Sequence, residues 1–325
     1  MPVPKTYGLE ASFFFKQKSL DKVCKVLDLT REQFRVLAAN ADTHYRIKEL
    51  QPGQKRRTET PQGVLRRVHD RLQNLLYRIE VPTYASALRR DVSYVGNAKA
   101  HAGDVHVLKT DIAKFYPSVK RHHVQHFLEK TLQMSPDLAA LLSRIMTVSG
   151  FVPTGSPLSQ TISFWSMYPM FQLLAKMSAE LGITFTVWVD DLVFSSLKPI
   201  SAGFRSAVTQ CLKAAEMKPK YAKTVLYRRG EPKKVTGTIL DTAGEARVPN
   251  GLRLSVVELA KGLEGKTSAP AEVLQRLVSK INSAQNIEPG IFKETKMRAM
   301  ALTAVRGPKK PPRSPRTKRT YPKVF

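Results

Sequence analysis

The segment from Thr186 to Ser196, TVWVDDLVFSS, places two adjacent aspartates between two short apolar runs. β-Branched and aromatic residues favour strands, so these runs predict a buried β-hairpin with Asp190 and Asp191 at its tip. An aspartate in a turn commonly does no more than accept backbone hydrogen bonds, so the segment alone leaves a purely structural role open. Other parts of the chain decide between that role and chemistry.

The balance of charge indicates a nucleic-acid partner. The 325 residues include 53 Lys and Arg against 26 Asp and Glu, a formal charge of +27. Release of counter-ions from phosphates is the readiest use of such an excess. The length also supports a large core, arranged as about two domains or as one lobed domain.

Cysteine content and hydropathy indicate the cellular compartment. Cys24 and Cys211 are too few and too far apart for a disulfide framework or a cysteine-based zinc site, which suits a reducing compartment. The N-terminus has no apolar signal core, and no run of ~18 apolar residues could span a bilayer. We therefore expect a cytoplasmic protein with no membrane partner.

The order of predicted elements gives the fold class. β-Rich runs predict strands that end at Asp111, form the hairpin above, and return near Tyr227 and after Lys234. Pro169 should bend one long helix, because proline removes a ladder hydrogen bond. Apolar residues at helical spacing predict helices over 18–40 (as a short pair), 64–79, 157–181, 202–217 and much of 255–304. The pattern is typical of an α+β fold around an antiparallel sheet.

The three aspartates form the main candidate site. Asp111 ends a predicted strand, and neighbouring strands of one sheet could bring it to Asp190 and Asp191. Clustered carboxylates either take up a proton or recruit a hard cation. Mg²⁺ binds oxygen ligands together with substrate phosphates, and two such ions about 3.5–4 Å apart serve in-line phosphoryl transfer.

Two further patterns leave alternatives open. His122 and His126 have a spacing that can bind a metal, but no cysteine or acidic pair completes a site, so an ordinary helix surface is the better interpretation. Arg66 and Arg67 lie off the apolar stripe of their helix. A solvated basic face and a face that binds a nucleic-acid backbone look the same at this level.

Six short motifs together resemble a known family. DIAKFY, TGSPLSQ, WVDD and the KT of YAKT are similar, in this order, to the successive palm motifs of reverse transcriptases. NAKAH (97–101) and VTG (235–237) resemble two hallmarks of bacterial retron reverse transcriptases. The resemblance implies a right-hand polymerase fold with fingers, palm and thumb. The expected domains are N-terminal helices and fingers (1–104), an antiparallel palm (105–245, with the finger–palm helix 157–181), a short helical thumb (246–305) and a flexible basic tail (306–325).

The resemblance also implies catalytic roles. Asp111 and Asp190 would bind two Mg²⁺ ions, with Asp191 as a supporting carboxylate and the Ile112 carbonyl as an extra ligand. Lys223 would protonate the departing pyrophosphate, a general-acid role.

Other roles concern binding. Tyr116 would lie beneath the sugar of the incoming nucleotide and exclude a 2′-hydroxyl, although an aromatic pair at this position could equally fill the core. The remaining nucleotide contacts would come from Ser156, Gln160, Lys55 and Arg57. Contacts to nucleic acid would come from Arg66, Arg67, Asn97, His101, Val235, Thr236 and Gly237.

Asn97 and His101 would also share one face of a helix, and a hydrogen-bonded structural pair fits them equally well. Three positions depart from the family pattern. Trp188 and Val189 replace the usual Tyr and Ala, which could alter primer placement or fidelity, and Lys114 replaces an acid.

The function that the resemblance implies is RNA-templated DNA synthesis from deoxynucleotides. The partner would be a structured noncoding RNA (msr-msd) that serves as template and primer. Priming from an internal guanosine 2′-hydroxyl would give a branched RNA–DNA hybrid (msDNA), in antiphage defence with a separately encoded effector. The alternatives are a reverse transcriptase of group II intron or diversity-generating type, and a noncatalytic RNA-binding protein with a polymerase-like fold.

Overall fold

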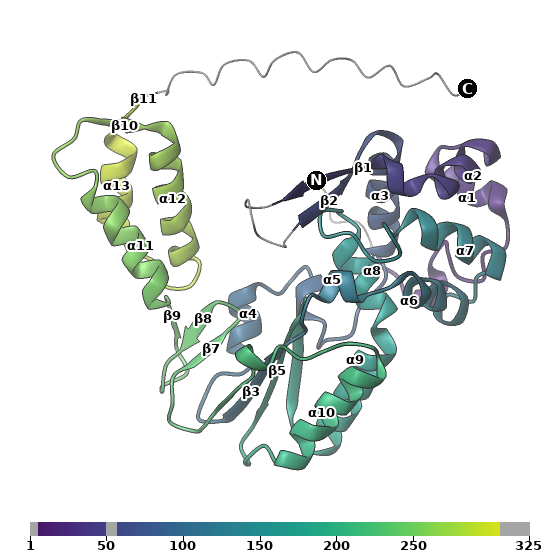
Figure 1. The fold of residues 1–325 in the computed structure, drawn as a ribbon. Helices are drawn as coiled ribbons and strands as arrows, with labels where there is room; N and C mark the ends of the chain where they lie inside the picture. The colour runs from purple at the N-terminus through teal and green to yellow at the C-terminus, as the bar shows by residue number, and fades with distance from the viewer. Residues whose placement is uncertain (1–5, 50–56, 306–325) are drawn as a thin grey trace.

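A computed structural model describes residues 6–49 and 57–305 (Figure 1). Lys55 and the predicted tail, 306–325, lie outside the described residues. The helices are α1 (Leu20–Leu27), α2 (Arg31–Ala39), α3 (Gly63–Leu76), α4 (Tyr94–Lys99), α5 (Phe115–Ser118), α6 (Arg121–His126), α7 (Pro136–Ile145), α8 (Ser159–Ser166), α9 (Tyr168–Glu180), α10 (Ala202–Ala214), α11 (Asn250–Lys261), α12 (Ala271–Gln285) and α13 (Lys293–Ala301). The strands are β1 (Tyr45–Glu49), β2 (Arg57–Pro61), β3 (His106–Asp111), β4 (Thr184–Trp188), β5 (Asp191–Ser196), β6 (Val225–Tyr227), β7 (Lys233–Val235), β8 (Thr238–Leu240), β9 (Ala246–Arg247), β10 (Ser268–Pro270) and β11 (Thr303–Val305).

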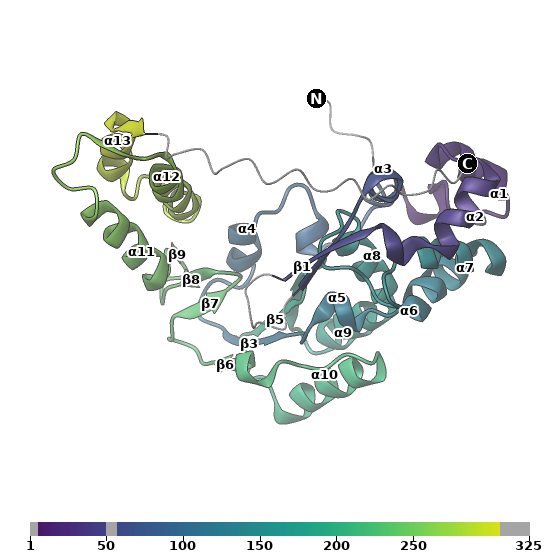
Figure 2. The same cartoon turned by 45° about the horizontal axis from the view of Figure 1, so that its top comes forward.

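The central sheet has the strand order β4-β5-β3-β6, and every neighbouring pair is antiparallel. Side chains alternate between its faces. Phe194 of β5 packs against Phe204 of α10, with ring centroids 5.3 Å apart. Val193, the preceding residue, belongs instead to an apolar cluster with Ala98 of α4 and Val235 of β7. Helices α9 and α10 therefore cover one face, while α4 and β7 cover part of the other (Figure 2). The predicted α+β class with an antiparallel sheet is confirmed.

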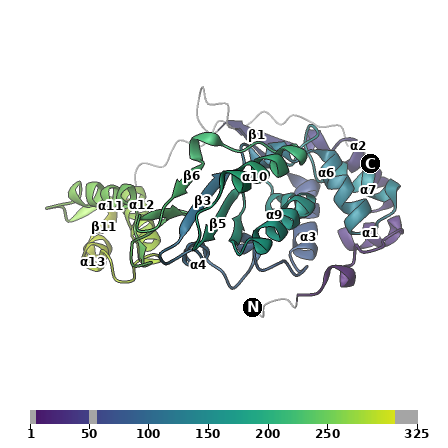
Figure 3. The same cartoon turned by 90° about the horizontal axis from the view of Figure 1, so that it is seen from below.

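The N-terminal helices share one continuous core with the sheet. Side chains from α1–α3 and α6–α8 belong to the same buried cluster as Phe194. Viewed from below, these helices lie beside α9 at one end of the molecule (Figure 3). Strands β1 and β2 pair antiparallel, from Tyr45 opposite Pro61 to Glu49 opposite Arg57.

The single helix predicted over 157–181 is wrong. The structure has two helices there, α8 and α9, interrupted at Met167. Pro169 is the second residue of α9. Because proline has no amide hydrogen, it fits the first turn of a new helix and cannot continue the ladder of α8.

The C-terminal helices α11–α13 form a separate apolar cluster that includes Val256, Leu277 and Ile281. They lie apart from the central sheet, to which the small β7-β8-β9 sheet connects them (Figure 1). The predicted boundaries of fingers, palm and thumb stay predictions. None of the helices in the described part of the chain has the length and apolar character needed to traverse a bilayer.

Candidate active site

The ends of β3 and β5 bring the predicted aspartates together. Asp111, the last residue of β3, lies directly opposite Asp191, the first residue of β5. Asp190 lies in the two-residue turn between β4 and β5, and its carbonyl accepts a hydrogen bond from the Ile112 amide at 2.8 Å. Carboxylates from two distant parts of the chain therefore meet at one end of the sheet.

Burial makes this acidic cluster costly in the absence of cations. Asp111 is 4% exposed. Burial raises the pKa of Asp190, and repulsion from Asp111 raises it further. Burial also raises the pKa of Asp191 to about 6, although Lys109 partly offsets this. Both desolvation and neighbouring like charge disfavour the charged form, so the cluster is suited to binding positive charge.

Two lysines supply positive charge from the chain itself. Lys223, in a 3-10 turn just before β6, forms an ion pair with Asp111, and this hydrogen bond raises the pKa of Lys223. The Lys109 Nζ atom lies 3.1 Å from Asp191 Oδ2. The other oxygen of this carboxylate, Asp191 Oδ1, is buried and has no hydrogen-bond partner among the described residues. The cluster thus retains a ligand atom that the protein does not use.

The donor set fits a hard divalent cation. Carboxylate oxygens and the Ile112 carbonyl are the ligand types that Mg²⁺ prefers. Within residues 6–49 and 57–305, the three carboxylates do not approach one another within 4.8 Å as one closed group. Instead, Lys223 and Lys109 each hold one of them. A bound cation would take over the charge compensation that these two ammonium groups provide.

A different group, His122, His123 and Glu216, does place its ligand atoms within 4.8 Å. The Nδ1 atom of His123 accepts a hydrogen bond from the Lys120 amide at 3.0 Å, so the neutral ring carries its proton on Nε2, the atom facing Glu216. Metal binding would require a free lone pair on that Nε2. Lys120 also holds Glu216 at 2.7 Å. We therefore interpret this group as ordinary protein surface, as the sequence already favoured for His122 and His126.

Sequence comparison identifies the relatives of this chain. No protein-family model matches it. The retron Mx162 reverse transcriptase of Myxococcus xanthus is 27% identical over 307 residues, covering 81% of this chain and 63% of that protein. The retron Se72 reverse transcriptase of Salmonella heidelberg is 26% identical over 211 residues, covering 64% and 52%. The chain is a relative of the bacterial retron reverse transcriptases.

The retron Ec48 reverse transcriptase of Escherichia coli is a further relative, 26% identical over 242 residues, with 69% of this chain and 59% of that protein covered. The chain thus spans little more than half the length of these retron proteins. Among solved structures it overlaps telomerase from Candida albicans in complex with a fragment of telomeric RNA. That match has a TM-score of 0.42 and 12% identity, covers 74% of this chain and 47% of the other, and supports no conclusion.

In the retron-like motif NAKAH, both signature side chains point into the protein. His101 is 1% exposed, and its Nδ1 and Nε2 atoms lie 2.7 Å from Ser195 Oγ and 2.8 Å from Thr186 Oγ1. Burial lowers the pKa of His101 to about 4, so the ring is neutral. It therefore joins β4 to β5 on the sheet face that carries Asp191.

The second retron-like motif, VTG, is joined to the first. The Asn97 side-chain amide donates to Thr236 Oγ1 at 3.2 Å. Val235 pairs with Thr238, which leaves Thr236 and Gly237 as a two-residue hairpin turn with φ of +43° and +78°. Such a turn favours glycine, because both central residues have positive φ. Asn97, His101 and Val235 are buried, Thr236 is half-buried and Gly237 is exposed, and contact of these residues with nucleic acid stays a prediction.

Tyr116 and Gln160 lie beside the aspartate hairpin. Tyr116, in α5, is partly buried, and burial together with the charge of Asp190 raises its pKa to about 12. Gln160, in α8, donates a hydrogen bond to the Ala87 carbonyl at 2.8 Å. Both positions are compatible with the predicted nucleotide contacts, which stay predictions.

The TGS segment is fixed against the β1–β2 hairpin. A side chain at Gly155 would come within 2.9 Å of the Glu59 carbonyl, so only glycine permits this approach. Ser156 does not face an open site, because its hydroxyl bonds the buried His69 at 2.6 Å. Arg57 forms an ion pair with Glu59 at 2.9 Å. The predicted contacts of Ser156 and Arg57 with nucleotide would require them to exchange these partners.

Three residues that matter here were not singled out from the sequence: His69, Glu59 and Lys109. His69 lies four residues after Leu65 in the apolar stripe of α3, and this position could have indicated burial. Lys109 precedes Asp111 by two residues, which places both on one face of a strand. Arg66 pairs with Asp70, and contact of Arg66 and Arg67 with nucleic acid stays a prediction.

Proposed function

We propose that this chain is a retron-type RNA-directed DNA polymerase. The observation that carries the proposal is the meeting of Asp111, Asp190 and Asp191 at one end of the central sheet, with a carboxylate oxygen unpaired. Two Mg²⁺ ions, when bound, would activate the attacking hydroxyl and stabilise the leaving phosphate. Asp111, Asp190 and the Ile112 carbonyl would hold them, and Asp191 would support the site electrostatically.

Lys223 would act as the general acid. Its ammonium group already bonds Asp111, and its side chain is 55% exposed, so it can reach a substrate phosphate on release from that carboxylate. The raised pKa of Lys223 keeps the proton in place until the leaving pyrophosphate needs it.

Tyr116 would select deoxynucleotides. Its position beside Asp190 supports a ring packed under the sugar of the incoming nucleotide, where a 2′-hydroxyl would clash. Tyr116→Ala should gain ribonucleotide incorporation while Tyr116→Phe should not, measured as the ratio of incorporation rates for matched deoxy- and ribonucleotides. An unchanged ratio in the alanine variant would assign the ring to core packing alone.

The finer assignment rests on the motif resemblance to retron reverse transcriptases. We propose that the template and primer are one structured noncoding RNA, and that synthesis from an internal guanosine 2′-hydroxyl yields a branched RNA–DNA hybrid. We further propose a cytoplasmic antiphage role with a separately encoded effector. Sequencing nucleic acid that copurifies with the protein tests this directly. A branched species supports the retron assignment, whereas unbranched cDNA would favour the group II intron or diversity-generating alternative.

Primer extension by the purified protein tests the activity itself. We expect RNA-templated deoxynucleotide incorporation that requires a divalent cation and is lost in Asp190→Asn. Lys22→Gln, an exposed change on the distant helix α1, serves as the matched control. Activity that survives Asp190→Asn would exclude the metal assignment, and a wild-type protein that binds RNA but never extends a primer would favour the noncatalytic alternative.

A further inference from the structure

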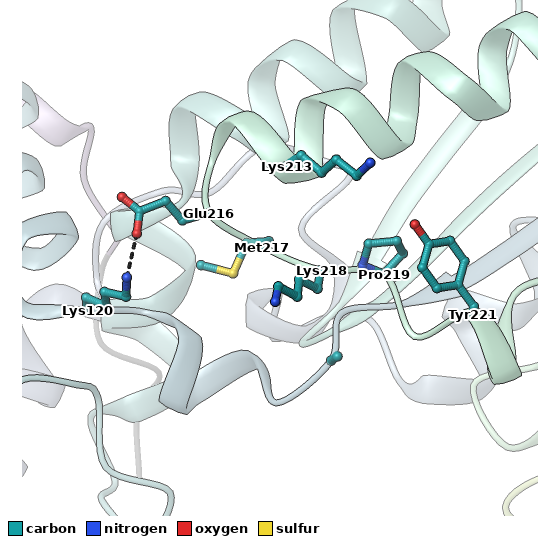
Figure 4. A pocket seen from close by; sticks show the side chains of 8 residues that line it. Lys120, Lys213, Glu216, Met217, Lys218, Pro219 and Tyr221 are labelled. Atoms are coloured by element: carbon teal, nitrogen blue, oxygen red, sulfur yellow. Dashed lines mark hydrogen bonds and ion pairs between the residues drawn. The ribbon is translucent and has the colours of Figure 1, made fainter.

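An open hollow of about 680 Å³ lies beside the candidate active site, on the side of α10 (Figure 4). It borders the end of β3, because the lining residue Ala113 lies two residues after Asp111, and its amide donates a hydrogen bond to the Lys218 carbonyl at 2.8 Å. None of the roles proposed above uses this hollow.

The lining of the hollow offers a flat aromatic surface. Met217 and Pro219 are buried beneath it. Tyr221 is 67% exposed, and its hydroxyl has no hydrogen-bond partner among the described residues. Pro219 and Tyr221 lie side by side at one end (Figure 4). An exposed aromatic ring without a polar partner is suited to stacking against a nucleobase of any identity.

The charge of the hollow favours an anion. Lys213 reaches over it from α10, and Lys218 lies below (Figure 4). Neither lysine forms an ion pair within the part of the chain that the structure describes. Glu216, the one acid among the lining residues, is paired with Lys120 at 2.7 Å and with His122 at 3.1 Å. Its repulsion of a phosphate is therefore largely cancelled.

We propose that this hollow binds one unpaired nucleotide of a single-stranded nucleic acid, with the base on Tyr221 and its phosphates on Lys213 and Lys218. The open shape and the +27 charge of the chain favour a strand over a free nucleotide. The identification of that strand as part of the template RNA rests on the proposed function. The site itself does not.

Strand binding tests the site without any catalysis. In the absence of divalent cations and nucleotides, the affinity for a short labelled oligo-U RNA is measured by fluorescence anisotropy. Tyr221→Ala should weaken binding about tenfold, the typical loss for one stacked base, while Tyr221→Phe retains it. Lys218→Gln should reduce the slope of log affinity against log salt by about 0.7. Lys22→Gln controls for a general loss of charge.

Each further outcome decides the question. Binding of a blunt-ended RNA duplex made of two complementary strands should be unaffected by Tyr221→Ala, because such a duplex has no unpaired base to stack. Wild-type affinity of Tyr221→Ala for oligo-U, or equal losses in the alanine and phenylalanine variants, would overturn the proposal. If free UMP displaces oligo-U at concentrations close to the dissociation constant of oligo-U, the hollow binds a free nucleotide instead. Asp190→Asn should bind oligo-U normally, which separates this proposal from the polymerase assignment.

Discussion

On one face of the central sheet, polar groups at one end lack hydrogen-bond partners, while polar groups at the other end are hydrogen-bonded. At one end, Asp111 and Asp191 are partly or fully buried, and Asp191 retains an unpaired oxygen. At the other end, four residues along β5, the Ser195 hydroxyl and the ring of His101 satisfy each other. A strand rises about 3.3 Å per residue, so the two ends are only about 13 Å apart.

This difference indicates how the hairpin carries a costly site. Unpaired buried oxygens and adjacent like charges destabilise the folded state. The His101 network is neutral and fully bonded, and it holds both strands of the hairpin at the end where no chemistry is expected. Stability at one end therefore permits unsatisfied groups at the other.

The largest expected effect comes from the acidic end. Asp190→Asn removes a proposed cation ligand and, together with it, a half-buried charge that repels Asp111. We expect nucleotide incorporation to fall by at least about 10³-fold, the scale of losing a principal electrostatic contributor, while thermal stability is unchanged or higher. Single-turnover primer extension and thermal unfolding measure the two quantities. A parallel loss of folding and activity would mean that Asp190 is structural.

Lys223→Gln should have the next largest effect. A general acid typically contributes 10²-fold or more, so we expect the rate of incorporation to fall about 10²-fold, with little change in nucleotide KM. Lys223→Arg retains the charge beside Asp111 but is a poorer proton donor, so it separates the two roles. If the arginine variant has the wild-type rate, the lysine serves only to compensate charge.

At the end of the sheet that carries His101, we expect a substitution to change how protein stability depends on pH. The folded pKa of His101, about 4, lies below its ordinary value of 6.5, so between these values the unfolded chain binds more protons and stability falls as pH decreases. His101→Gln should lose about 2 kcal/mol at pH 7 through broken hydrogen bonds. When the pH falls from 6.5 to 4, the free energy of unfolding of the wild type should decrease because of His101. In the variant this decrease should be smaller by up to about 3 kcal/mol. Urea unfolding across this range measures both, and parallel curves would contradict the assignment.

The turn between the two strands should show the smallest effect. Val189 has φ of +61°, an unfavourable conformation for a β-branched residue. Val189→Gly should relieve this strain and stabilise the protein by about 1 kcal/mol, after the entropy cost of glycine is subtracted. Activity should drop a few-fold, because Asp190 is then less rigidly placed. A less stable glycine variant would show that the valine side chain is needed for packing.

Local features of this face could be predicted from the sequence. The β-rich runs around Asp190, and the strand ending at Asp111, follow from residue type and alternation alone. The α+β class follows from their order. The sequence predicted a bent helix where the structure has a break between α8 and α9 at Met167. The position of a proline does not indicate whether a helix kinks or ends and starts again.

Long-range partners could not be predicted. Nothing in the local pattern says that Asp111 lies opposite Asp191 without a one-residue shift, since register depends on the packing of the whole face. His101 bonds residues 85 and 94 positions away, and Ser156 bonds His69 across 87 positions. Such pairs depend on tertiary structure. The motif resemblance singled out Asn97 and His101 for contact with nucleic acid, but their burial and their partners within the protein came only from the fold.

Direct measurement of bound cations tests the central claim. With template–primer and a non-hydrolysable deoxynucleotide present, Mn²⁺ titration followed by electron paramagnetic resonance should reveal two ions per chain, the number that an in-line phosphoryl-transfer site employs. Asp190→Asn should remove at least one of them, and His101→Gln should remove neither. If the wild-type and Asp190→Asn proteins bind Mn²⁺ identically, the aspartates at the end of the sheet do not form a metal site.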